Sequence, residues 1–351
     1  MTYALIGCGR VSPNHIRAAL ENQLDIVALC DLNEKKMQET AAKLPKSVAC
    51  YTDYRRLLAE SGAQMVAIAT DSGKHAEIAL AAIGAGKHVL IEKPMALSME
   101  DARRICQAAQ ESGVTVGVCH QNRFNTAVVQ LRKALEAGRF GKLSHGAVTV
   151  RWNRSEAYYD QAAWRGTWAQ DGGTLMNQCI HGIDLLRWMM GDEISEVCGM
   201  TARRLHEHTE CEDIGMAVIR FKNGALGTVE GTANVYPRDM EETLSIFGQH
   251  GTVKLGGGSV NKIDRWVFAD GEEDMTVYEE KPENVYGNGH VWLYADFLAA
   301  IRENRPPLVD TYAGMAALEL VLAIYKSQKE GCVVRLPLDN FDCNDMKENT
   351  K

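Results

Sequence analysis

Tyr3-Ala4-Leu5-Ile6-Gly7-Cys8-Gly9, near the start of the chain, is a short apolar run that passes directly into two closely spaced glycines. Such a run predicts a buried strand that ends in a tight turn. Helical patterns separate it from four further apolar runs in the first third. Alternating strands and helices predict a parallel, doubly wound α/β sheet. The expected strands are 3–6, 26–30, 65–70, 89–91 and 114–118, and the expected helices are 15–21, 33–44, 53–60, 74–85 and 99–112.

The pattern changes after Arg123, where longer strand-like segments take over. Phe221-Lys222-Asn223-Gly224-Ala225 is typical of a hairpin, because Asn-Gly supplies the positive φ angles of a tight turn. This half predicts an α+β domain with a large, mostly antiparallel open sheet and helices on one face. We expect one domain over 1–123, a second over 124–338 and a polar tail over 339–351. The expected strands are 144–152, 196–204, 214–221, 225–233, 243–248 and 265–268, and the expected helices are 126–137, 177–190, 292–302 and 312–329.

Composition narrows the functional classes. A chain of 351 residues is long enough for two domains. The formal charge of −8 argues against nucleic acid or an anionic membrane surface as the main partner. Ten scattered cysteines without a CxxC pair predict mostly reduced core thiols. With no leader-like segment and no bilayer-spanning apolar stretch, a cytoplasmic enzyme is the default expectation.

The first glycine turn is a candidate phosphate-binding site. Residues 7–12, Gly-Cys-Gly-Arg-Val-Ser, match GxGxxG except at the last glycine, where serine is nearly as small. The following helix would present free N–H groups and its positive dipole end to phosphate. An ordinary strand-to-helix turn would have the same pattern. Asp31 at the end of the second strand favours the dinucleotide, because a carboxylate there binds ribose hydroxyls and repels a 2′-phosphate, which indicates NAD.

Two further segments carry candidate catalytic groups. Glu92-Lys93-Pro94 directly follows an apolar run, at the strand end where open α/β sheets bind ligands. In residues 171–184, helical spacing puts Asn177 and His181 on one face, one turn apart, with Asp184 on the next turn. A core helix with a hydrogen-bonded histidine is the competing interpretation of His181.

Taken in this order, the motifs resemble those of the Gfo/Idh/MocA family of NAD(P)-dependent sugar oxidoreductases. The resemblance covers nearly the whole chain and also includes Gln121-Asn122-Arg123-Phe124 and Trp164-Arg165-Gly166. It implies an N-terminal Rossmann domain over 1–123 and a C-terminal α/β domain that often makes oligomer contacts. Asn177-Gln178 together with Tyr158-Tyr159 is similar to the branch that includes UDP-N-acetylglucosaminuronate 3-dehydrogenases.

The resemblance also implies roles for individual residues. Lys93 corresponds to the family's active-site lysine and His181 to its catalytic histidine. Most members have an aspartate where this chain has Asn177, so we expect Asn177 to orient a substrate hydroxyl while His181 and Lys93 handle the proton. The expected NAD contacts are Gly7, Gly9, Arg10, Val11, Asp31, Thr70, His75, Glu92, Lys93, Pro94, Gln121, Trp164 and Arg165. The expected substrate contacts are Lys93, Arg123, Arg154, Tyr158, Tyr159, Asn177 and His181.

The expected reaction is oxidation of a secondary hydroxyl, C3 by the resemblance, of a sugar or UDP-sugar. Arginines and tyrosines over residues 151–165 suit a phosphorylated or carboxylated sugar, because guanidinium groups grip oxyanions. An interface loop would have the same composition. Two alternatives stay open: an NAD-dependent glycosidase that oxidises C3 transiently, and a non-catalytic NAD-sensing regulator. We expect no metal, because the acids and histidines of residues 206–213 are too closely packed for a standard zinc spacing. We expect a homodimer or homotetramer formed through the second-half sheet.

Overall fold

The computed structural model describes residues 1–191, 193–280 and 287–347. The chain divides into two compact units, Met1–His120 with His290–Met315, and Gln121–Gly289 with Ala316–Lys351. The expected boundary at residue 123 lies close to the observed one, but residues 290–315 return to the first unit. They do so because Phe297 packs against Gly117 and because the Val118 N–H donates to the Val309 carbonyl at 3.0 Å.

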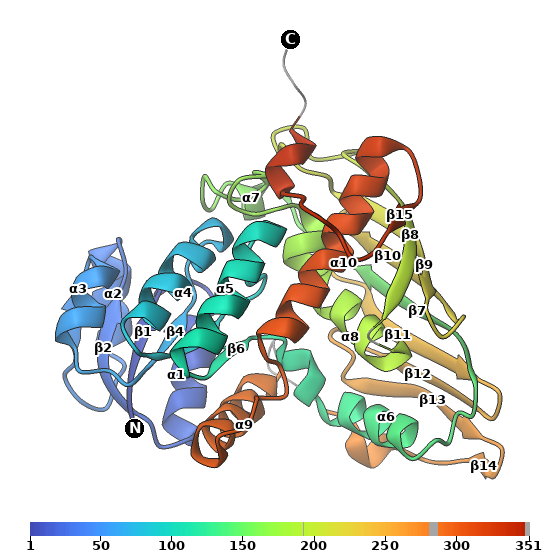
Figure 1. Cartoon of the computed structure of the whole chain (residues 1–351), viewed down its shortest axis with the longest axis horizontal. Coiled ribbons are helices and arrows are strands. Elements are labelled where there is room, and N and C mark those ends of the chain that lie inside the picture. Colours follow the sequence, from blue (N-terminus) through green and yellow to red (C-terminus); the bar gives the residue numbers. More distant parts are fainter. Residues whose placement is uncertain (192, 281–286, 348–351) are drawn as a thin grey trace. The chain divides into compact units, whose positions relative to one another are not determined.

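The first unit is a Rossmann domain built on a six-stranded parallel sheet, which confirms the predicted fold class (Figure 1). Its strand order is β3-β2-β1-β4-β5-β6. The central strands β1 and β4 are completely buried or nearly so, as their continuous apolar runs predict. The strands are β1 Thr2–Ile6, β2 Asp25–Cys30, β3 Ala49–Tyr51, β4 Met65–Ile68, β5 His88–Ile91 and β6 Val116–Val118.

Helices connect successive strands of this sheet. Capping groups fix several of their ends: the Ser98 side chain accepts from the Asp101 N–H at the start of α5, and Gly113 ends that helix with φ 69°. The helices are α1 Ser12–Glu21, α2 Glu34–Ala41, α3 Tyr54–Glu60, α4 His75–Gly84, α5 Met99–Ser112 and α9 Gly289–Glu303, with the short 3-10 helix η1 Ser72–Lys74.

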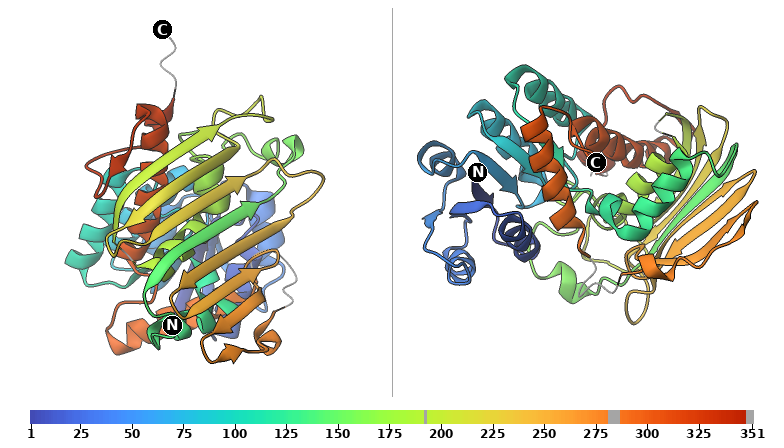
Figure 2. Two further views of the ribbon diagram at one scale, coloured as in Figure 1. Left: turned by 90° about the vertical axis from the view of Figure 1, so that its right-hand side faces the viewer. Right: turned by 90° about the horizontal axis from the view of Figure 1, so that it is seen from below.

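The second unit is built on a nine-stranded sheet of order β14-β13-β12-β11-β7-β10-β9-β8-β15. All its pairings are antiparallel except β7 with β10, so the expected mostly antiparallel sheet is confirmed. Figure 2 (left) shows these strands side by side. The strands are β7 Leu143–Arg151, β8 Ile194–Ala202, β9 Ile214–Phe221, β10 Leu226–Thr232, β11 Glu241–Gly248, β12 Gly251–Gly256, β13 Lys262–Phe268, β14 Gly271–Glu272 and β15 Val334–Arg335.

Helix α8 packs on the inner face of this sheet, where Gly146 of β7 lies against Met190 and Leu186. The C-terminal part of α10 packs on β8, where Gly199 lies against Ile324. Residues 339–347, expected as a polar tail, instead bury Phe341 and Cys343. The helical elements are η2 Gln121–Phe124, α6 Thr126–Glu136, α7 Glu156–Tyr159, η3 Leu175–Cys179, α8 Ile180–Met190, η4 Thr276–Tyr278, α10 Thr311–Glu330 and η5 Cys343–Met346.

None of the helices in the described ranges is both long and apolar enough to cross a membrane.

Candidate active site

The turn between β1 and α1 has the geometry of a dinucleotide-binding turn. Gly7 has φ 104°, and a Cβ there would lie 2.3 Å from the Ala69 carbonyl oxygen, so only glycine fits. A Cβ at Gly9 would meet nothing within 4 Å, which leaves the backbone open on that side. Pro13 occupies the first turn of α1, where its missing N–H costs nothing. The turn and the helix N-terminus that follows Arg10 and Val11 therefore fit a pyrophosphate.

Asp31 joins this turn to the end of β2. Its Oδ2 accepts from the Cys8 N–H at 2.7 Å, and its Oδ1 accepts from the Asn33 N–H at 2.7 Å. A carboxylate has about four acceptor positions, so these two bonds leave capacity for ribose hydroxyls. The negative charge beside the glycine turn fits NAD and opposes a 2′-phosphate.

His75 was expected to contact the cofactor, but both of its ring nitrogens face backbone carbonyl oxygens of the first unit. Its Nδ1 lies 2.7 Å from the Pro94 carbonyl oxygen and its Nε2 lies 3.2 Å from the Thr70 carbonyl oxygen. Burial lowers the pKa of the ring, so it is neutral and donates to only one of these acceptors. The buried imidazole thus joins the segments after β4 and β5 instead of presenting a polar atom to a ligand.

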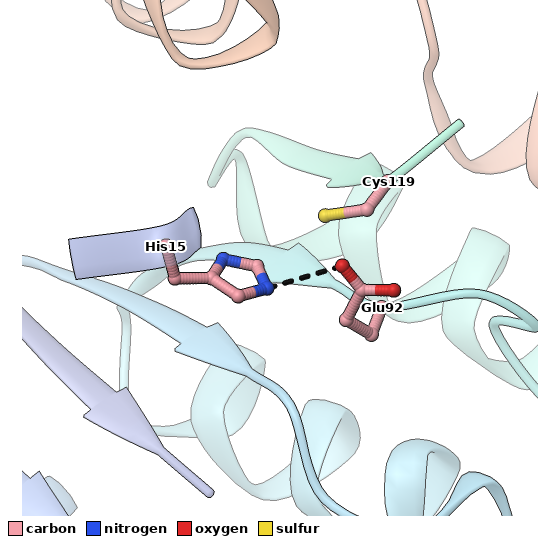
Figure 3. A group of neighbouring side chains, drawn as sticks. All are labelled: His15, Glu92 and Cys119. Carbon is pink, nitrogen blue, oxygen red and sulfur yellow. Dashed lines mark hydrogen bonds and ion pairs between the residues drawn. The ribbon is translucent and has the colours of Figure 1, made fainter. Parts of the chain in front are cut away.

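Glu92 follows β5 directly, and Lys93 is the next residue in the chain. Glu92 is 6% exposed, and its Oε2 accepts the backbone N–H of Lys93 at 3.1 Å. Figure 3 shows its Oε1 beside the imidazole of His15 and near the thiol of Cys119. The Lys93 backbone is therefore fixed from inside the first unit.

In the second unit, His181 lies in the first turn of α8 and is 6% exposed. The Gln121 amide Nε2 lies 3.3 Å from its Nε2, so donation from the amide leaves Nε2 as the basic nitrogen. The preceding residues, Leu175–Cys179, form a π-helical turn where a regular α-helix was expected. Asn177 and His181 are therefore not related by one turn of a regular α-helix, as the sequence analysis assumed. Such π-helical turns occur often at functional sites.

Asn177 has an acidic neighbour that sequence reasoning missed. Its side-chain amide donates to Asp171, which is 3% exposed and also accepts the Gly166 N–H at 2.6 Å. The Asn177 Oδ1 accepts from Gln178 Nε2 at 3.2 Å. These bonds fix which end of the amide faces which partner. The position of Asp171 directly before two glycines was the available signal, since such a turn brings the residues on either side together.

Arg123 was expected to contact the substrate, but its guanidinium binds a buried aspartate instead. Its guanidinium donates two hydrogen bonds to Asp184, at 2.6 and 2.7 Å, and both side chains are almost completely buried. The ring of Trp188 lies 4.7 Å from the guanidinium carbon. This pair fastens η2 to α8, so Arg123 supports the helix that carries His181.

The other arginines and tyrosines form one connected cluster around Gln178. Arg154 Nε donates to the Gln178 Oε1 at 2.7 Å, and the Gln178 amide donates to the Tyr158 hydroxyl at 2.9 Å. Arg165 Nη1 donates to the same hydroxyl at 2.5 Å, and its guanidinium lies over the rings of Tyr158 and Trp164. The structure brings these expected contacts together within the second unit.

A small recess opens beside this cluster. Its lining includes Tyr159, Asp171, Asn177, Gln178 and Glu212. Glu212 is buried; its Oε1 accepts from the Leu175 N–H at 2.8 Å and the Tyr325 hydroxyl at 2.7 Å, while its Oε2 has no partner in the described part of the chain. Burial raises its pKa to about 8. The lining of this recess therefore combines amide, phenol and acid groups.

Residues 206–213, considered above as a possible metal site, form hydrogen bonds within the loop between β8 and β9. The Asp213 carboxylate accepts the backbone N–H groups of Arg204, Leu205 and His206, and His206 Nδ1 lies 3.1 Å from it. These bonds engage both side chains in holding the turn between β8 and β9.

A strand, a glycine turn and a helix with an acid after the second strand, joined to an α/β unit with a buried histidine, define a dinucleotide-dependent oxidoreductase. The chain belongs to the Gfo/Idh/MocA oxidoreductase family. Residues 1–120 match its NAD-binding Rossmann fold and residues 132–336 match its C-terminal alpha/beta domain. The resemblance and the NAD cofactor predicted from the sequence are thereby confirmed.

Solved structures and curated relatives place the chain among sugar and polyol dehydrogenases. The WlbA dehydrogenase of Bordetella pertussis, in complex with NADH and UDP-GlcNAcA, is 38% identical over 96% of this chain and 99% of its own, with TM-score 0.87. The Chromobacterium violaceum WlbA with the same ligands is 34% identical over 97% and 96%, with TM-score 0.88. Myo-inositol 2-dehydrogenase of Thermotoga maritima is 26% identical over 96% and 98%.

Proposed function

We propose that the protein oxidises the C3 hydroxyl of a UDP-sugar that carries a carboxylate. The observation that carries the proposal is the cluster of Arg154, Tyr158, Arg165 and Gln178, which is attached to the π-helical turn that leads into the helix of His181. Arg154 already pairs with Asp239 at 3.0 Å, but the Arg165 guanidinium over the Tyr158 and Trp164 rings favours a ligand with oxyanions, since planar forks bind carboxylate and phosphate. The 38% identity to a dehydrogenase solved with UDP-GlcNAcA supports the same substrate class.

In this proposal His181 takes the hydroxyl proton on Nε2, which exchanges its contact with the Gln121 amide for the substrate hydroxyl. The Lys93 ammonium donates to the substrate oxygen and stabilises its developing negative charge. Asn177, fixed by Asp171 and Gln178, orients the hydroxyl. The residues of the glycine turn and Asp31 would hold NAD, which would supply the hydride acceptor for the sugar carbon. No residue needs to act as the acid usually found at position 177.

The substrate class is tested by following NADH absorbance with a panel of UDP-sugar acids, neutral UDP-sugars, free sugar acids, sugars and inositols. We expect turnover with UDP-GlcNAcA and little with neutral UDP-sugars. A response restricted to free polyols would overturn the nucleotide-sugar assignment. Glycoside cleavage without net NADH would favour the glycosidase, and tight NAD binding without turnover on any compound would favour the regulator.

We further propose a homodimer or homotetramer formed through the open sheet face. Met200 and Met216 pair directly on neighbouring strands and are 76% and 50% exposed, beside the exposed Cys198 and Val218. Such a contiguous apolar face favours a protein partner. Light scattering of Met216→Glu, compared with wild type, tests this: a mass that does not change contradicts it.

We also propose a cytoplasmic setting. All ten cysteines are described and none forms a disulfide, which supports it.

A further inference from the structure

The π-helical turn that leads into α8 begins with two backbone N–H groups that need acceptors from outside the helix. The Asn177 N–H donates to the Gly173 carbonyl oxygen at 2.8 Å, one turn earlier in the chain. The N–H groups of Leu175 and Met176 come before that bond, so no carbonyl of the same helix is available to them. A buried N–H without an acceptor is costly, so the start of the turn depends on its surroundings.

A buried carboxyl and a buried phenol supply the two acceptors. The Leu175 N–H donates to Glu212 Oε1 at 2.8 Å, and the Met176 N–H donates to the Tyr325 hydroxyl at 3.3 Å. The Tyr325 hydroxyl in turn donates to Glu212 Oε1 at 2.7 Å. Both side chains are buried. An ionised carboxylate and a carboxyl protonated on Oε2 can both accept at Oε1, so these bonds do not depend on the charge of Glu212.

Three glycines let the turn lie close to this carboxyl and to the sheet. Gly173 has φ 97°, and a Cβ there would overlap with Glu212 Oε2. A Cβ at Gly215 of β9 or at Gly231 of β10 would lie 2.6 Å from the Leu175 side chain. The side chain of Leu175 is therefore packed on the two strands while its N–H is held by the carboxyl.

Glu212 belongs to the acid-rich segment 206–213, whose acids accept backbone N–H groups. Glu210 Oε2 accepts the Trp168 N–H at 3.1 Å. Asp213 accepts N–H groups of its own loop. Within this segment, Glu212 is the acid that reaches the π-helical turn.

We propose that Glu212 is a positioning residue that fixes the π-helical turn leading into α8. It acts on the turn through the backbone of Leu175 and through Tyr325, and it needs no contact with the substrate. The turn carries Asn177 and continues directly into α8, so a displacement of the turn moves Asn177 and His181 together. The inference rests on the proposed function only in giving these two residues a catalytic task.

The first test measures backbone hydrogen exchange over residues 171–184 in the full-length protein without substrate, by mass spectrometry at single-residue resolution. Glu212→Leu keeps the approximate size of the side chain but removes the acceptor, so the Leu175 amide should exchange about tenfold faster or more. Glu212→Gln keeps a carbonyl oxygen for both bonds and should restore slow exchange. Tyr325→Phe removes only the hydroxyl and should accelerate Met176 more than Leu175.

Glu207→Leu is the matched control, because it makes the same change at an exposed glutamate of the same loop. We expect wild-type exchange at Leu175 in this variant. Unchanged exchange at Leu175 in Glu212→Leu, or equally fast exchange in Glu212→Leu and Glu212→Gln, overturns the proposal. If Glu212→Leu does not fold, Tyr325→Phe decides, and unchanged exchange at Met176 in it overturns the proposal.

Turnover separates positioning from a general loss of stability. With UDP-GlcNAcA, folded Glu212→Leu should lower kcat about tenfold or more with little change in the Kd for NADH, because a small misplacement of catalytic groups is costly. Glu212→Gln should recover most of that turnover. A normal kcat in folded Glu212→Leu would confine Glu212 to stability and overturn the positioning role.

A second readout keeps this inference separate from the substrate proposal. If no UDP-sugar is turned over, the proposed function fails but the exchange results stand. The imidazole C–H signals of His181 in NMR spectra, assigned with His181→Ala, then replace kcat. They should move in Glu212→Leu and return in Glu212→Gln, and signals that stay in place in both variants overturn the proposal.

Discussion

Two sets of buried carboxyl groups, one in each unit, have opposite chemistry. Glu92 in the first unit lies within hydrogen-bond distance of the imidazoles of His15 and His290 and accepts a backbone N–H, and its pKa is held well below the ordinary value. Glu242 in the second unit is as deeply buried, but neither of its oxygens has a partner within the described residues, and burial raises its pKa to about 8. Glu212 accepts two bonds and still has a pKa of about 8.

The difference teaches that burial does not decide the charge of an acid; the number and kind of donors decide it. Desolvation disfavours the charged form of all three carboxyls. Only Glu92 has enough donors to reverse that effect. The first unit therefore holds an ionised carboxylate at Glu92, whereas the second unit keeps the protonated acids Glu212 and Glu242.

The largest expected effect is the loss of turnover when Lys93 in the first unit or His181 in the second is replaced. Lys93→Met removes the ammonium and His181→Ala removes the base, so each should lower kcat by orders of magnitude while the Kd for NAD stays similar. Stopped assays with UDP-GlcNAcA and a fluorescence titration of NADH measure the two quantities. Near-normal turnover in both variants would remove the catalytic assignment.

A second prediction concerns Asp184, a carboxylate of the second unit that does have a charged partner. Arg123→Leu removes both short guanidinium hydrogen bonds from this buried aspartate, whose contact to Arg187 is longer, at 3.5 Å. We expect the free energy of unfolding to fall by about 3 kcal/mol, as for other broken buried ion pairs, measured by urea denaturation. Arg56→Leu, which breaks an exposed pair with Glu60, is the control and should change stability little. Equal effects of the two substitutions would contradict the distinction between partnered and solvated carboxylates.

The third prediction concerns Glu242, whose carboxyl oxygens have no hydrogen-bond partner among the described residues. With an ordinary value of 4.5 and a folded pKa of about 8, Glu242 keeps its proton in the folded state over a range where the unfolded chain has lost it. Stability should therefore fall as pH rises from 5 to 8, by about 1.4 kcal/mol per pH unit from this group. Glu242→Gln should make the slope shallower by that amount in urea denaturation at several pH values.

Glu207→Gln, which changes an exposed glutamate of the same unit, is the control for that series and should keep the wild-type slope. A slope that is the same in Glu242→Gln and wild type would show that Glu242 is ionised in the folded protein. The contrast with Glu92 would then disappear.

The sequence predicted the regular elements well where local patterns decide them. Strand β9 and helix α5 have the expected bounds, and the turn at Asn223-Gly224 is present with φ 88° at the glycine. It missed β3, β12, β14 and β15, of which three are only two or three residues long, so that hydrophobic periodicity has too few residues to act on.

The candidate site was predicted as a list of residues but not as a set of partners. Local patterns indicated Gly7, Asp31 and Lys93, because strand ends and glycine turns can be recognised from neighbours in the chain. They could not indicate that His290 joins Glu92 or that Tyr325 joins Glu212, since each pair is far apart in sequence. Arg123 illustrates the opposite failure: an arginine suited to an oxyanion is occupied by a buried aspartate.

The parallel pairing of β7 with β10 has a consequence for how the second unit forms. Each half of the large sheet can grow by antiparallel pairing of strands that follow one another, β8 with β9 and β10, and β11 with β12 and β13. The seam between the halves joins Leu226 to His145 and Thr232 to Arg151, and α8 lies in the chain between them. Contacts so distant along the chain close late and slowly. The seam is therefore the step at which a nascent chain would expose its sheet edges longest, and where a chaperone or a partner strand has its best opportunity.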